Sequence, residues 1–214
     1  MMGKKKDEYA CFNDLAATEI EGVDYRICVT DRTSRIAIVA PHGGWIESAT
    51  SQIAAAIAAA EFSLYCFEGL RPGRPHSDLH IKSEIFDEPK ACHLVEDTEI
   101  AIGVHGRKDN GDQQTVWVGG LDFGLRDRIA KALMQNGFNA VVRNSGETLA
   151  GIDRNNICNR GSSKAGVQLE VPRTLRHQLA NNTPRLNNFA DAVRAAIGQY
   201  IADGDSVSDQ NAMG

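Results

Sequence analysis

Seven short strand-like segments alternate with helical segments along this chain, and this alternation constrains the fold more than any other feature. Each segment is rich in β-branched or aromatic residues, which favour extended backbone. The segments are Tyr25–Val29, Ile36–Ala40, Phe62–Phe67, Glu99–Val104, Thr115–Val118, Phe138–Val142 and Val167–Val171. Strands that alternate with helices predict a three-layer α/β/α fold, in which helices cover both faces of a mixed, mostly parallel sheet.

Three of the intervening segments carry the spacing of helices that pack on a core. Glu47–Ala60 has Ile53 and Ile57 four residues apart on an alanine-rich background. Asp122–Gly137 has an apolar residue at every fourth position and ends in a glycine suited to close a helix. The third helix is predicted over Arg185–Ala202, where large apolar residues again recur every fourth position.

The composition fits one compact domain. Of the 214 residues, 42% are hydrophobic and 24% are charged, close to ordinary globular usage. We expect a single domain over residues 1–203 and a polar, disordered tail over residues 204–214. The formal net charge of −5 argues against nucleic acid and against an anionic membrane as partners.

Neither a membrane span nor a disulfide scaffold is visible in the sequence. No run approaches the roughly 18 consecutive apolar residues of a transmembrane helix. The segment Met1–Asp7 lacks the apolar stretch of a signal peptide, so we expect synthesis in the cytoplasm. The five cysteines are odd in number and include no Cys-x-x-Cys pair, which argues against a disulfide framework and a zinc ribbon.

Two histidines follow predicted strands. His42 comes directly after Ile36–Ala40 in the run Pro-His-Gly-Gly, with Glu47 five residues later at the start of a helix. His105 ends the strand that begins at Glu99 and is also followed by a glycine. Two imidazoles and a carboxylate are a ligand set that catalytic zinc uses. The competing interpretation is a loop histidine and a glutamate that complements the helix dipole.

The remaining histidines are weaker candidates. His80 lies in a segment that alternates polar and apolar residues like a half-buried strand, so it could replace a ligand or line the pocket, and pocket lining is favoured. His76, His93 and His177 lie in polar or Pro/Gly-rich surroundings and are interpreted as surface residues.

Glu170 is the best candidate for an acid–base residue. It lies in the short apolar strand Val167–Val171, on the face opposite its valine and leucine side chains. A glutamate there is costly unless it is hydrogen-bonded, paired or functional. A metallohydrolase needs a carboxylate that moves protons between water and the leaving group. The alternative is a surface pair with Arg173 or Arg176.

Several short motifs carry a resemblance when they are taken together. They are His42-Gly43-Gly44 with Glu47, Leu79-His80-Ile81-Lys82-Ser83, Phe86-Asp87-Glu88-Pro89, Val104-His105-Gly106, Asn159-Arg160-Gly161 and Gln168-Leu169-Glu170-Val171-Pro172-Arg173. Their combination resembles the poly-γ-glutamate hydrolase family, which occurs in phages of Bacillus and as prophage or chromosomal copies. The resemblance spans about Tyr25 to Tyr200.

The resemblance implies a zinc-carboxypeptidase-like fold and cleavage of γ-glutamyl amide bonds in a polyanionic polymer. One Zn²⁺ would be held by His42, Glu47 and His105, with Glu170 as general base and acid. Zinc carboxypeptidases use a tighter His-x-x-Glu pair, so the likeness to that wider group is one of arrangement.

For the substrate carboxylates the first candidate is Arg160 and the second is Arg173, with His80 lining the pocket. Either arginine could instead be an ordinary surface residue.

Two alternatives remain open beside this function. The same zinc site could act on the γ-glutamyl bonds of peptidoglycan peptides, or the chain could be a non-catalytic phage or prophage module of the same fold. We expect a monomer. Release by host lysis would bring a protein without a signal peptide to an extracellular polymer.

Overall fold

The computed structural model describes the backbone of residues 9–212 and the side chains of residues 9–205. Its strands are β1 (Tyr25–Thr30), β2 (Ile36–Gly44), β3 (Ser63–Gly69), β4 (Ile100–Arg107), β5 (Thr115–Gly119), β6 (Asn139–Val142) and β7 (Val167–Pro172). The α-helices are α1 (Phe12–Ala16), α2 (Thr50–Ala58), α3 (Pro89–Glu96), α4 (Phe123–Gln135), α5 (Arg173–Ala180) and α6 (Thr183–Ala212), and the short 3₁₀ turns are η1 (His76–Asp78) and η2 (Ile157–Asn159). Each predicted strand is present, with ends shifted by a few residues.

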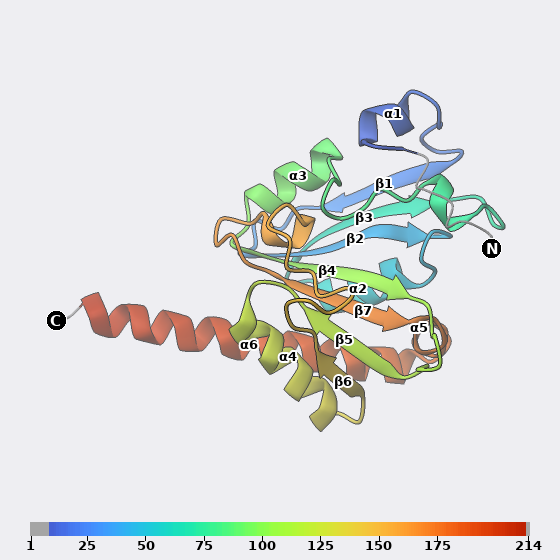
Figure 1. Ribbon diagram of the computed structural model, residues 1–214. Helices are drawn as coiled ribbons and strands as arrows, with labels where there is room; N and C mark the ends of the chain where they lie inside the picture. Colours follow the sequence, from blue (N-terminus) through green and yellow to red (C-terminus); the bar gives the residue numbers. More distant parts are fainter. Residues whose placement is uncertain (1–8, 213–214) are drawn as a thin grey trace.

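The seven strands form one mixed sheet in the order β1-β3-β2-β4-β7-β5-β6 (Figure 1). The pairs β2–β3, β2–β4, β4–β7 and β5–β6 are parallel, while β1–β3 and β5–β7 are antiparallel. The prediction of a mixed, mostly parallel sheet is therefore confirmed. Because β2, β4 and β7 are adjacent and parallel, their carboxyl ends meet at one edge of the sheet, where ligands of such sheets bind.

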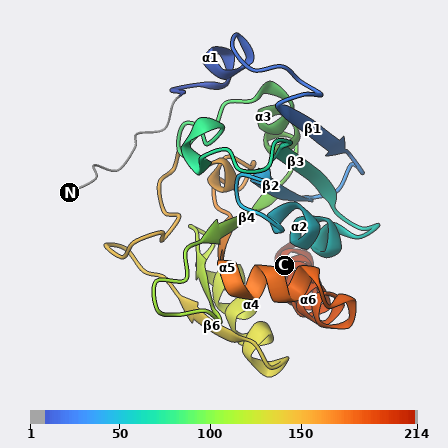
Figure 2. The ribbon, with the colours of Figure 1, turned by 90° about the vertical axis from the view of Figure 1, so that its right-hand side faces the viewer.

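Two hydrophobic cores pack on the two faces of this sheet. The larger contains Ile53 and Ile57 of α2, Ile129 of α4 and Val193 of α6. The smaller lies on the opposite face and contains Leu94 of α3 and Ile157 of η2. Figure 2 shows α2, α5 and α6 gathered on one side of the sheet. The predicted arrangement of three layers is confirmed.

The structure differs from the predicted helices and strands in several places. Helix α6 continues through Gly204 to Ala212, past the predicted start of a disordered tail, and Arg35 pairs with Asp205 on its exposed part. The short helices α1, α3 and α5 were not predicted, although α3 begins at a proline whose preceding residue, Glu88, caps it. The alternating segment around His80 is not a strand.

Two sequence expectations fall partly or wholly outside the described residues. The segment Met1–Asp7 lies outside them, as do the last two residues of the predicted tail. Among the described residues, no helix combines the length and apolar character that crossing a membrane requires. The five cysteines are all free thiols.

Candidate metal centre

The loop after β2 folds back so that His42 and Glu47 converge. The pairing of β2 with β3 shifts register between Ala40 and Gly43, which turns the backbone at the end of the strand. Gly44 has a φ of +62°, and a Cβ atom at this position would lie 2.2 Å from a backbone oxygen of β3, so only glycine fits. The Glu47 amide then donates to the His42 carbonyl oxygen over 2.8 Å and closes the loop.

Three donor atoms from this loop and from β4 meet at one point. His42 Nδ1 lies 3.5 Å from Glu47 Oε2, His105 Nδ1 lies 3.9 Å from the same oxygen, and the two Nδ1 atoms are 3.2 Å apart. Ligands bound tetrahedrally to zinc at 2.0–2.2 Å are separated from one another by about 3.3–3.6 Å. The spacing of the three atoms therefore fits one zinc ion.

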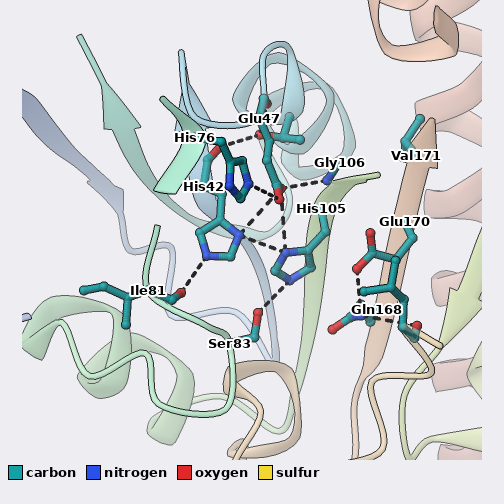
Figure 3. A network of polar contacts seen from close by, with 12 residues as sticks. His42, Glu47, His76, Ile81, Ser83, His105, Gly106, Gln168, Glu170 and Val171 are labelled. Carbon is teal, nitrogen blue, oxygen red and sulfur yellow. Dashed lines mark hydrogen bonds and ion pairs between the residues drawn. The ribbon is translucent and has the colours of Figure 1, made fainter. Parts of the chain in front are cut away.

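The outer contacts of these side chains direct the donor atoms inward (Figure 3). His42 Nε2 donates to the Ile81 carbonyl oxygen over 2.7 Å, which directs Nδ1 toward Glu47 and His105. His105 Nε2 lies 3.4 Å from Ser83 Oγ, and Glu47 Oε2 accepts the Gly106 N–H over 2.7 Å. Such second contacts fix the tautomer and orientation of metal-binding histidines.

Two more histidines extend the cluster toward solvent. The rings of His80 and His42 are 4.1 Å apart, and donor atoms of His80, His42 and Glu47 lie within 4.8 Å of one another. His80 can thus line the site or act as an alternative ligand, as the sequence left open. His76 is exposed, as the sequence predicts, but it also borders the site, because its Nε2 lies 3.4 Å from Glu47 Oε1 and its ring packs 4.3 Å from that of His80.

Glu170 lies beside the cluster on the neighbouring strand. It is the register partner of His105 in the parallel pair β4–β7, so the two side chains share a face of the sheet. Figure 3 shows its carboxyl on the side of β7 that faces His105. Glu170 is only 5% exposed and has no ion pair within 4.0 Å among the described residues. The alternative of a surface pair with Arg173 or Arg176 is therefore wrong.

A buried amide holds the Glu170 carboxyl. Gln168 Nε2 donates to Glu170 Oε1 over 2.9 Å, and Gln168 Oε1 accepts from Asn156 Nδ2 over 2.8 Å. All three side chains are buried. Neither amide residue was singled out from the sequence, although Gln168 stands two residues before Glu170, the spacing that places side chains on one face of a strand.

The surroundings shift the pKa values of Glu170 and Glu47 in opposite directions. Burial, and then the negative charge of Glu47, raise the pKa of Glu170 well above its usual value. Burial alone would also raise the pKa of Glu47, but its contacts with His42, His76 and His105 hold that pKa well below the usual value. Glu47 is therefore the ionised carboxylate of the pair, as a metal ligand must be, while Glu170 is able to hold a proton.

The surroundings of His105 and His80 keep both imidazoles neutral. Burial, with the neighbouring His42, lowers the pKa of His105 to about 4. Burial, with His42 and His76, lowers the pKa of His80 to about 2. Neutral imidazole is the form that binds a metal ion.

A cavity of about 830 Å³ opens beside this cluster. Among the described residues that line it, Glu47, His76 and Gly106 connect it to the centre. Arg173 and His177 also line it, and His177 is exposed, as the sequence predicts. One wall of the centre is thus open to a ligand of considerable size.

Arg160, the first candidate for substrate binding, does not line this cavity. Its guanidinium donates to backbone carbonyl oxygens instead, at 2.7 Å for both Asn155 and Phe86 and more loosely for Ser83 and Glu84. Arg160 therefore fixes the segment that carries Ser83, the outer partner of His105. The structure assigns it a supporting place rather than the expected contact with substrate.

Comparisons with known proteins identify the family of this chain. The profile of a family described as poly-gamma-glutamate hydrolase matches residues 9–201, nearly all of the described chain. The chain belongs to the poly-γ-glutamate hydrolase family. The resemblance seen in the sequence motifs is thereby confirmed.

Relatives and solved structures support the same assignment. The chain is 37% identical over 176 residues to the SPbeta prophage-derived UPF0714 protein YoqZ of Bacillus subtilis strain 168, covering 82% of this chain and 62% of YoqZ. It is 36% identical over 171 residues to UPF0714 protein YmaC of the same strain, covering 79% and 71%. The chain thus spans about two thirds of the length of these relatives.

Two solved structures share the whole fold. A bacteriophage poly-gamma-glutamate hydrolase superposes with a TM-score of 0.85 at 31% identity, covering 92% of this chain and 99% of that one. The zinc-free apo form of YndL gives 0.84 at 30% identity, covering 90% and 98%. An N-formylglutamate amidohydrolase from Ralstonia eutropha JMP134 shares the fold alone, with a TM-score of 0.57 at 10% identity and coverage of 85% and 99%.

Proposed function

We propose that this chain is a zinc-dependent hydrolase that cleaves the γ-glutamyl amide bonds of poly-γ-glutamate. The observation that carries the proposal is the convergence of His42, Glu47 and His105 at the spacing of tetrahedral zinc ligands, beside a buried glutamate. Family membership gives the substrate class. The zinc-free description of the YndL structure supports the choice of metal.

The donor set suits zinc chemically as well as in spacing. Two imidazoles and one ionised carboxylate leave a fourth tetrahedral position open, which is the catalytic arrangement. When bound there, zinc would polarise the scissile carbonyl and lower the pKa of water from 15.7 to about 7. One ion per chain is proposed, with His80 as part of the pocket wall beside His42.

Glu170 is proposed to carry the protons. Its carboxylate takes a proton from the attacking water as the new C–O bond forms, and it returns that proton to the amine as the C–N bond breaks. Gln168 holds Glu170 Oε1 through its amide, so one carboxyl oxygen is fixed while the other can exchange the proton. The raised pKa of Glu170 suits a group that must both accept and donate near neutral pH.

The substrate is proposed to lie in the cavity beside Glu47. Poly-γ-glutamate carries a free carboxylate on every residue, so its binding needs local cations in a protein whose net charge is −5. Arg173 lies on the cavity wall and is exposed, so it is proposed to contact these carboxylates. We further propose that the protein is synthesised in the cytoplasm, is a monomer and reaches the polymer when the host cell lyses.

Digestion of the polymer tests the function. Zinc-loaded protein is incubated with poly-γ-glutamate and with purified cell walls, and chain length and released peptides are followed. We expect shortening of the polymer alone. Release of peptides from cell walls without shortening of the polymer would favour the peptidoglycan alternative, and inertness toward both with zinc bound would favour a non-catalytic module.

Substitution of the ligands tests the site. His42→Ala and His105→Ala are expected to lose zinc and activity together, because each removes one of three protein ligands. His93→Ala is the matched control, since that side chain is 82% exposed and pairs with Asp97 on the surface. Zinc content and activity that survive both His42→Ala and His105→Ala would overturn the assignment.

A further inference from the structure

Arg176 is a buried arginine on the wall of the cavity. Its residue is 5% exposed, and it lines the cavity together with Gly106. Arg176 Nε donates to the Val171 carbonyl oxygen over 3.1 Å, and Nη1 donates to the Ser48 carbonyl oxygen. The guanidinium lies against Gly106, where a Cβ atom would come within 2.4 Å of Arg176 Cζ. Its position is therefore fixed from three sides.

Within the described part of the chain, this buried charge has no carboxylate partner. Among the described residues no Asp or Glu oxygen lies within 4.0 Å of the Arg176 guanidinium, whereas the buried Arg107 and Arg126 pair with Asp112 and Asp127. Burial lowers the pKa of Arg176, while the more distant charges of Glu47 and Glu170 act in the opposite direction. Buried charges in proteins are almost always paired or bound to a ligand, so an unpaired one on a cavity wall indicates an anionic ligand.

Other cations of the same wall are also uncompensated. Lys108 and Arg173 line the cavity beside Arg176 and form no ion pair among the described residues. Elsewhere on its lining, Arg26 pairs with Glu68 and Arg74 pairs with Glu19. The excess positive charge is therefore concentrated on the wall that Arg176 shares with Gly106, next to the metal ligands.

We propose that Arg176 binds the free carboxylate of a glutamyl unit adjacent to the scissile bond. The Val171 and Ser48 carbonyl oxygens accept from Nε and Nη1, whereas Nη2 makes no hydrogen bond among the described residues, so the Nη1–Nη2 edge of the guanidinium is assigned to a bidentate carboxylate. This inference rests on the proposed function and deepens it. It makes Arg176 the residue that distinguishes a polymer with free carboxylates from the same backbone without them.

The test compares two substrates that differ only at the carboxylate. Zinc-loaded wild-type protein is given γ-linked glutamyl oligomers with free α-carboxylates and the same oligomers as α-carboxamides. We expect kcat/KM for the free-acid oligomer to exceed kcat/KM for the carboxamide by at least about tenfold, which is the effect of one hydrogen-bonded charge pair. Arg176→Gln should reduce this preference toward one, mainly by slowing the reaction of the acid.

The controls separate a binding role from a structural one. Arg126→Gln changes another buried arginine outside the cavity lining and should leave the preference unchanged. If thermal melting and zinc content show that Arg176→Gln does not fold, Arg176→Lys provides the test. Lysine keeps the charge but loses the bidentate edge, so the preference for the acid oligomer over the amide should fall in part.

The outcomes are distinguishable from a failure of the proposed function. A wild-type protein that cleaves neither oligomer refutes the function itself. A wild-type protein that cleaves acid and amide equally well, or a folded Arg176 variant that slows both by the same factor, refutes the role of Arg176 while the hydrolase function stands.

Discussion

Replacing Gln168 with leucine removes the amide that holds Glu170, with little change in side-chain size. The bond lost is the 2.9 Å contact from Gln168 Nε2 to Glu170 Oε1, inside a buried network. Hydrogen bonds to charged groups contribute about 1.5–3 kcal/mol, so kcat/KM should fall by a factor of about 10–150. The amide also favours the ionised carboxylate, so its loss should raise the pKa of Glu170 further and move the acid limb of the kcat/KM profile to higher pH.

The assay is a pH profile of polymer cleavage with zinc content measured at each point. Gln168→Glu is a useful second variant, because it keeps an acceptor for Asn156 Nδ2 but places a second carboxyl group beside Glu170. It should shift the acid limb of the pH profile further than Gln168→Leu does. A Gln168→Leu protein with a lowered melting temperature and an unchanged pH profile would show that the amide only stabilises the fold. That result would refute its role in positioning Glu170.

Three further perturbations follow from the geometry. In metal-free protein, Glu170→Gln should be more stable than wild type above pH 4.5, and the difference should grow as pH rises toward the raised pKa of Glu170. The reason is that the unfolded wild-type chain loses the Glu170 proton at a lower pH than the folded chain does. Equal melting curves from pH 4 to 8 would contradict this. Arg160→Ala should lower the free energy of unfolding by about 2–3 kcal/mol, because the carbonyl oxygens that Arg160 binds lose their donor. It should also weaken zinc binding through the segment that carries Ser83. Unchanged thermal unfolding would argue against this role. Gly44→Ala should lower both the thermal stability and the zinc content, because the new Cβ atom would lie 2.2 Å from a carbonyl oxygen of β3. A Gly44→Ala protein that binds zinc normally would refute the proposed need for glycine.

The sheet was predictable because its strands are short runs of β-branched and aromatic residues. Central strands such as β2 and β7 are buried on both faces, which requires such runs and leaves a clear signal in the sequence. The end of α6 was missed because Gly204 and a polar tail indicate a stop, whereas Arg35 and Arg128 pair with Asp205 and Asp203 along that part of the helix.

The candidate ligands could be predicted because a tight loop and parallel strands place them together. One loop joins His42 and Glu47, and His105 lies near the end of the parallel neighbour β4, so their meeting follows from the topology. His76 and Arg176 were missed because their contacts depend on packing between segments that are far apart, as in the bond from Arg176 to the Ser48 carbonyl oxygen. Arg160 was misassigned because sequence alone does not reveal that backbone carbonyls surround its guanidinium.

The central claim is that Glu170 works as the proton carrier beside a zinc ion held by His42, Glu47 and His105. It is tested most directly by measuring polymer cleavage and metal content in the same samples of wild-type and Glu170→Gln protein. We predict about one zinc per chain in both proteins, shortening of poly-γ-glutamate by the wild type, and a fall of about 10²–10⁴-fold in rate for the variant. Equal rates for the two proteins, or full activity of the metal-free wild type, would contradict the account.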